Sequence, residues 1–218
     1  MAKIKKAFTL AELLVSLAVI GIIAALTLPT LNSGIDKSAN ADAMKKAFYY
    51  LGEVIEIPAS MGDSYKKWDY DSLTSENIYR KLRPYLSITK ECIGSTGCWT
   101  TESVVGLNES TAQGFSSSGY GQSPVTFRMS DGVAVSISLT ADSLNVEREK
   151  QTVPVFAVDV NGDEAPNKLG DDIFLFVLGD SGLLPAGNDV DDGIGNCTEN
   201  GIGTDCAARI IREGSRKY

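Results

Sequence analysis

The feature that most constrains this chain is an apolar run that begins almost at its first residue. Three lysines precede the run, and between Phe8 and Leu28 the only charged residue is Glu12. A helix over this run would span about 30 Å, the thickness of the hydrocarbon core of a bilayer. A secretory signal has a shorter apolar region that ends at a small-residue cleavage site, whereas "TLPTLNSG" follows here. The sequence therefore predicts a membrane-spanning helix, with the lysines in the cytoplasm and the rest of the chain outside it.

Glu12 is not explained by a plain membrane anchor. An unpaired carboxylate in an apolar environment costs several kcal/mol, roughly, so an ionisable residue in such a segment is expected to have a function and a partner. The alternative is that the Glu12 carboxylate simply extends to the membrane interface.

The segment "KKAFTLAELLVSLAVIGIIAALTLP" resembles the leader and N-terminal helix of type IV pilins and type II secretion pseudopilins. In that family, basic residues and a small residue precede a Phe, and a Thr-Leu-x-Glu motif and an apolar helix follow. The resemblance covers residues 3 to about 31. It implies that a prepilin peptidase cuts between Ala7 and Phe8 and then methylates the new amine of Phe8. The family usually has glycine where this chain has Ala7.

The same resemblance supplies a partner for Glu12. In a filament, the apolar helices would leave the lipid and pack together, and the free amine of Phe8 on a neighbouring subunit would pair with the Glu12 carboxylate. Such a pair would also fix the register between subunits. Pro29 lies where helices of this family can kink or locally melt; the alternative is that Pro29 only ends the membrane segment.

An amphipathic helix is predicted after Pro29, because apolar residues recur at every fourth position up to Pro58, where we expect the helix to end. These residues are Ile35, Ala39, Ala43, Ala47, Leu51 and Ile55. A short helix with Ser75 as its cap is predicted over residues 75–83. Residues 106–123, rich in glycine and serine, are predicted to be a mobile loop. Strands are predicted over residues 132–139, 153–160 and 172–178, joined as an antiparallel meander.

The predicted fold is α+β: a long N-terminal helix, transmembrane in its first half, packed on an antiparallel sheet as in pilins. Its parts are a prepilin leader (1–7), a transmembrane and filament-core helix (8–30), an amphipathic helix continuing into the head (31–58), and a globular β-rich head with disulfide loops (59–218).

The cysteines fall into two close pairs, Cys92 with Cys98 and Cys197 with Cys206. Outside the cytoplasm, two short-loop disulfides are the favoured interpretation. A metal site is the alternative, although neither pair is CxxC and the chain has no histidine. Four cysteines allow three pairings. A short helix containing Ile210 and Ile211 is expected after the second pair.

An acidic loop, "DVNGDEAPNKLGDD", separates the last two predicted strands. Oxygen side chains at alternate positions, with Gly162 for a tight turn, suit Ca²⁺. The candidate ligands are Asp159, Asn161, Asp163, Asp171 and Asp172. The alternative is a solvated hairpin in which these residues serve the geometry of the turn. A structural Ca²⁺ ion is the only cofactor that the sequence suggests.

These features predict a structural subunit of a type IV pilus or type II secretion pseudopilus rather than an enzyme. The absence of histidine removes the commonest general base, and "GDSG" at 179–182 is expected to be a turn rather than a protease motif. The net charge of −8 argues against nucleic acid as a partner. The expected partners are copies of the chain, other pilins, prepilin peptidase and the inner-membrane assembly machinery. The expected location is the bacterial inner membrane, with the head outside the cytoplasm, and then a periplasmic or extracellular filament.

Two other functions stay open at this point. One is a minor pilin that acts as an adhesin, whose head binds a surface or a secreted substrate. The other is an unrelated protein with a single membrane anchor.

Overall fold

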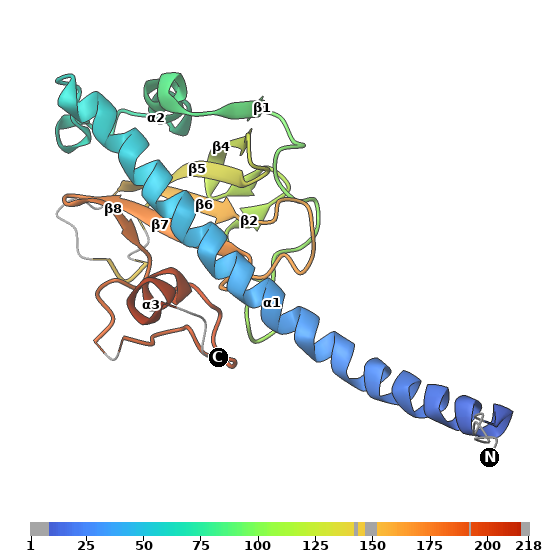
Figure 1. Ribbon diagram of the computed structural model, residues 1–218. Helices are drawn as coiled ribbons and strands as arrows, with labels where there is room; N and C mark the ends of the chain where they lie inside the picture. The colour runs from blue at the N-terminus through green and yellow to red at the C-terminus, as the bar shows by residue number, and fades with distance from the viewer. Residues whose placement is uncertain (1–8, 142–143, 147–151, 192, 215–218) are drawn as a thin grey trace, which may run out of the picture. The chain divides into compact units, whose positions relative to one another are not determined.

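The computed structural model describes residues 9–141, 144–146, 152–191 and 193–214 (Figure 1). The chain divides into two units, Met1–Ser38 and Ala39–Tyr218.

A single helix, α1 (Leu10–Ser60), contributes to both units and has 51 residues. It is assigned as helical without interruption through Pro29 and Pro58, so neither proline ends it. The predicted end at Pro58 is therefore wrong by two residues. A proline lacks an N–H donor but keeps its carbonyl acceptor, and the Pro58 carbonyl accepts the N–H groups of Met61 and Asp63, both at 3.0 Å. Among the residues that the structure describes, no helix combines the length and the apolarity needed to cross a membrane.

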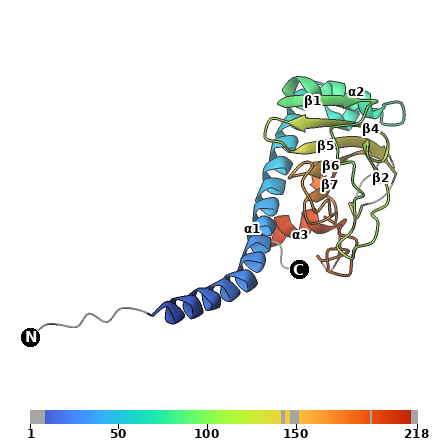
Figure 2. The ribbon, with the colours of Figure 1, turned by 90° about the vertical axis from the view of Figure 1, so that its right-hand side faces the viewer.

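The second unit has an α+β fold built on one six-stranded sheet, in which all neighbouring strands are antiparallel (Figure 2). The sheet order is β1 (Ile88–Ile93), β4 (Gln122–Met129), β5 (Ala134–Thr140), β6 (Val153–Asp159), β7 (Ile173–Gly179) and β8 (Gly182–Pro185). A separate small hairpin joins β2 (Phe115–Ser116) and β3 (Gly119–Tyr120). Shorter helical elements are η1 (Tyr65–Lys67), α2 (Ser75–Leu82), η2 (Arg83–Tyr85) and α3 (Cys206–Glu213). The α+β class, the antiparallel sheet and three of its strands were predicted correctly.

The part of α1 that belongs to the second unit packs on one face of the sheet. The Phe48 ring lies 5.3 Å from the ring of Phe176 in β7, centroid to centroid. The buried side chains of this helical segment recur every three or four residues, as a helix with one apolar face requires. Apart from Pro58 near the helix end, they are Ala41, Met44, Ala47, Leu51, Val54 and Ile55. The predicted stripe was right from Ala47 onward, whereas Ala39 is exposed and Ala43 only half-buried.

The opposite face of the sheet is also covered, which explains why every residue of β6 and β7 is buried. Trp99, Val104 and Ala112 pack there in a second core with the hairpin residue Tyr120. The Tyr120 backbone N–H donates to Ser136 Oγ at 2.9 Å. Residues 106–123, predicted to be a mobile loop, instead carry the β2–β3 hairpin and cover the sheet, because three aromatic rings anchor the segment.

Candidate functional site

The first turn of α1 is closed by a reciprocal pair of hydrogen bonds between Thr9 and Glu12. The Thr9 backbone N–H and hydroxyl donate to Glu12 Oε2 at 2.9 and 2.8 Å, and the Glu12 backbone N–H donates to Thr9 Oγ1 at 3.3 Å. This is a capping box, the arrangement that a Thr-x-x-Glu sequence favours at a helix start. The "TLAE" motif therefore also caps the helix, a role that was not predicted. The three-residue spacing of Thr9 and Glu12 was the signal for it.

Apolar side chains surround the helix beyond this cap. They are exposed within the isolated chain, from 78% for Leu10 to 49% for Val19. The group consists of Leu10, Leu13, Leu14, Val15, Leu17, Val19, Ile20, Ile22 and Ile23. A helix that is apolar on all sides is normally buried, either in a protein core or in a membrane. Glu12 is the one charged residue among the described positions of this stretch, from 9 to 23.

A family model of the prokaryotic N-terminal methylation motif matches residues 3–28. The chain carries the signature of type IV pilins and pseudopilins. No curated protein and no solved structure matches this chain. The motif supports a type IV pilin-like precursor. Ala7 and Phe8, the predicted cleavage and methylation residues, lie outside the described residues, and for Pro29 only the helical backbone is described.

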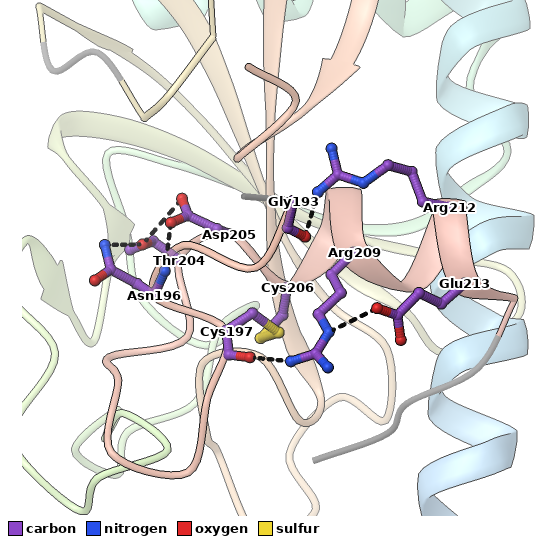
Figure 3. The surroundings of a disulfide bond; sticks show 9 residues. All are labelled: Gly193, Asn196, Cys197, Thr204, Asp205, Cys206, Arg209, Arg212 and Glu213. Carbon is purple, nitrogen blue, oxygen red and sulfur yellow. Dashed lines mark hydrogen bonds and ion pairs between the residues drawn. A yellow bond between two sulfur atoms is a disulfide. The ribbon is translucent and has the colours of Figure 1, made fainter. Parts of the chain in front are cut away.

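The cysteines of the second unit are paired locally, Cys92 with Cys98 and Cys197 with Cys206. Around the second disulfide, polar contacts hold the loop to α3, the predicted terminal helix (Figure 3). Arg209 donates to the Cys197 carbonyl at 2.5 Å and pairs with Glu213 at 3.1 Å. The buried Asp205 carboxylate accepts the Asn196 backbone N–H at 2.7 Å. The C-terminal loop is therefore fixed by side chains as well as by the disulfide.

Two of the predicted calcium ligands, Asp159 and Asp172, are fully buried at the facing ends of β6 and β7. Asp172 accepts the backbone N–H groups of Asn167 and Lys168 at 2.8 and 2.6 Å and the Asn161 side-chain amide at 3.2 Å. Burial raises the pKa of the Asp172 carboxyl to about 6. Burial, and next the Asp172 charge, raise the pKa of Asp159 to about 8. Two buried carboxylates whose charges repel each other require either a proton on one of them or a bound cation.

Three buried oxygen atoms around this pair have no hydrogen-bond partner among the described residues: Asp159 Oδ2, Asn161 Oδ1 and Asn167 Oδ1. Asn167 was not predicted as a ligand, because its oxygen becomes relevant only when the loop folds back onto Asp172. Asp163 is exposed and pairs with Arg128 instead, and Asp171 raises the pKa of Asp172 but is not buried. Among the described residues, no three acidic, cysteine or histidine side chains form a group that could hold a metal ion.

A cleft of about 570 Å³ opens at another end of the head. It lies between the start of α2, the Cys92–Cys98 loop, the β2–β3 hairpin and the start of β4, and serine and threonine residues make up much of its lining. This cleft was not predicted, because its walls come from four segments that are separated in sequence.

Proposed function

We propose that this chain is the precursor of a filament subunit, of a type IV pilus or a type II secretion pseudopilus, that prepilin peptidase cleaves between Ala7 and Phe8 and methylates at Phe8. The observation that carries the proposal is the methylation motif at residues 3–28, within which a helix begins that is apolar on all sides and contains one carboxylate. Before assembly the apolar part of α1 would be held in the bacterial inner membrane, with the head outside the cytoplasm. After assembly the same surface would be buried against other subunits.

In this proposal Glu12 exchanges one set of partners for another. Its carboxylate accepts two hydrogen bonds from Thr9 in the single chain, and a carboxylate has room for further donors. The amine of Phe8, which exists only after cleavage, would bring a positive charge from a neighbouring subunit. A paired charge in an apolar core is tolerable, whereas an unpaired one is strongly destabilising. Processing would thus be required before assembly.

Glu12→Gln and Thr9→Val separate the two roles of this motif. The glutamine keeps a capping-box acceptor but removes the charge, and the valine removes the Thr9 hydroxyl but keeps the charge. We expect Glu12→Gln to be cleaved and methylated normally yet excluded from filaments, and Thr9→Val to be incorporated. The measurements are mass spectrometry of the mature N-terminus and immunoblots of sheared filaments. An unprocessed N-terminus in the parent chain, or normal assembly of Glu12→Gln, would show that the proposal is wrong.

A structural Ca²⁺ ion near Asp159 and Asp172 is a second proposal, supported by the three unpartnered buried oxygens described above. Oxygen ligands of this kind suit Ca²⁺ rather than a transition metal. Ca²⁺ should raise the melting temperature of the parent chain relative to EGTA, because a ligand that binds only the folded state stabilises it. Asp159→Asn should lose that increase, and Mg²⁺ should not replace Ca²⁺. A melting temperature that is identical in Ca²⁺ and EGTA would show that the folded chain binds no structural Ca²⁺ ion.

The alternative function, a minor pilin whose head binds a surface or a substrate, is supported by the hydroxyl-lined cleft. It is compatible with filament assembly, because the residues that line the cleft all belong to the head.

A further inference from the structure

The cleft is bounded by structural elements of the head that are individually fixed. Thr74 and Glu76 at the start of α2 form one wall, and Gly94 and Ser95 of the Cys92–Cys98 loop form another. The β2–β3 hairpin and the first residues of β4 complete it. Its volume of about 570 Å³ falls within the range of small-molecule sites, roughly 300–1,000 Å³.

Two of these walls are rigid before any ligand arrives. The disulfide closes the loop that carries Ser95, and Lys90 Nζ donates to the Gly97 carbonyl in the same loop at 2.6 Å. The start of α2 is held by a capping box in which Thr74 and Asn77 bond each other's backbone N–H, at 3.0 and 3.2 Å. A preformed wall reduces the entropy that a ligand loses on binding.

The wall from β4 contains a backbone irregularity. The register of β4 with β5 shifts between Gln122 and Val125, and Ser123 within that bulge has a φ of 46°, in the left-handed region. Bulges re-aim side chains and are frequent beside binding sites. A non-glycine residue in this region is strained, and such strain clusters at functional sites. The strain at Ser123 therefore lies at a wall of the cleft.

The chemistry of the lining is hydroxylic and nearly uncharged. The side-chain hydroxyls of Ser95, Ser118 and Ser123 have no hydrogen-bond partner among the residues that the structure describes. Each can both donate and accept. Glu76 is the one charged residue among the described residues of the lining, and both of its bonds with Arg80 go to Oε1. Its Oε2 is available to accept from a ligand hydroxyl.

The lining also contains apolar surface, from Ile93, Pro124 and Val125. A ligand that presents both C–H faces and hydroxyl groups matches this combination, whereas phosphates and acidic sugars would meet a carboxylate without a lining cation. We propose that the cleft binds a neutral saccharide. The inference gives a ligand class to the binding-head alternative above and does not depend on filament assembly.

The test uses the full chain in a zwitterionic detergent without a sugar headgroup, and saturation-transfer NMR with three neutral probes: chitotriose, maltotriose and lactose. We expect at least one to bind the parent chain in the millimolar range, and glucose 6-phosphate not to bind. If none of the three neutral saccharides shows saturation transfer, or if glucose 6-phosphate binds better than all three, the inference is wrong.

Adjacent serines on the hairpin turn supply a matched pair of variants. Ser118 lines the cleft and the exposed Ser117 does not. Ser118→Tyr should fill the cleft and weaken binding at least tenfold, and Ser117→Tyr should leave it unchanged, with equal melting temperatures. As a second variant, Ser123→Gly removes a hydroxyl while tolerating the positive φ, so it should weaken binding without loss of stability. Equal binding by both tyrosine variants, or undiminished binding by Ser123→Gly, would contradict the inference. Processing and filament incorporation, assayed separately on Ser118→Tyr, show whether the subunit function fails independently.

Discussion

Glu12 shows how a single residue can serve both the separate chain and the assembly. In the single chain its carboxylate completes a capping box with Thr9, so the start of α1 is fixed before any partner is present. The proposed pair with the amine of a neighbouring Phe8 uses the same carboxylate. The Thr-x-x-Glu pattern, which was explained at first only by filament assembly, therefore also specifies where the helix begins.

At the scale of single residues, Asp63 is expected to make the stability of the protein depend on pH in the acid range. Its two oxygens accept from Trp68 Nε1 and Lys81 Nζ, both at 2.7 Å, and Lys81 also lies 5.2 Å from the Trp68 ring centroid. The Lys81 bond, and next that of Trp68, hold the pKa of Asp63 below its usual value. A lowered pKa means that the stabilisation is complete above the ordinary pKa of an aspartate and is lost as the pH falls through the lowered value.

Asp63→Asn should remove this acid step while keeping an acceptor for the indole of Trp68. Because the Asp63 side chain is half exposed, the loss at neutral pH should stay below about 1 kcal/mol. The measurement is the chemical shift of the Trp68 indole N–H between pH 7 and pH 2, assigned by comparison with a Trp99→Phe variant. An unchanged acid transition in Asp63→Asn would show that another group causes it.

At the scale of elements, the strands that the sequence revealed are those buried on both faces. β6 and β7 are mainly apolar, β5 alternates apolar with hydroxyl side chains, and all three lie inside the sheet. β1 was missed because it is an edge strand whose exposed residues Thr89, Lys90 and Glu91 break any apolar pattern. β4 was missed because Pro124 and the bulge at Ser123 disturb its alternation. Edge position and bulges depend on neighbours that a local pattern does not contain.

The cap of α2 gives the element-scale prediction. The sequence placed the cap at Ser75, but Ser75 is buried inside the helix and Thr74 is the N-cap, in a capping box with Asn77. Thr74→Ala should lower the free energy of unfolding by about 1 kcal/mol, the usual cost of losing such a cap, and Thr74→Ser should restore it. Urea unfolding followed by circular dichroism measures both. An equal loss in the two variants would mean that the methyl group, not the hydroxyl, matters at this position.

At the scale of the whole molecule, the packing of loops on the second face of the sheet could not be predicted from the sequence. Trp99, Phe115 and Tyr120 come from segments without regular periodicity, yet their rings lie in series, with centroids 6.2 and 4.8 Å apart. The polar cleft and the partners of Asp172 arise in the same way, from loops that meet only after folding. Motif spacing could identify the methylation signal and the cysteine pairs because both depend on short sequence distance.

The division of the chain at Ala39 leads to the whole-molecule prediction. A chain that begins at Ala39 keeps all the buried α1 side chains of the head, from Ala41 to Ile55. It should therefore unfold cooperatively at the same temperature as the head within the full chain. A chain that begins at Gly52 loses Met44, Ala47 and Leu51 from the core. Truncating one large buried apolar side chain costs about 2–5 kcal/mol, and a typical domain is stable by only about 5–15 kcal/mol. We expect this shorter chain to lose its cooperative melt, followed by near-ultraviolet circular dichroism. A chain from Ala39 that fails to fold, or one from Gly52 that melts normally, would show that the stability of the head does not come from this helical segment.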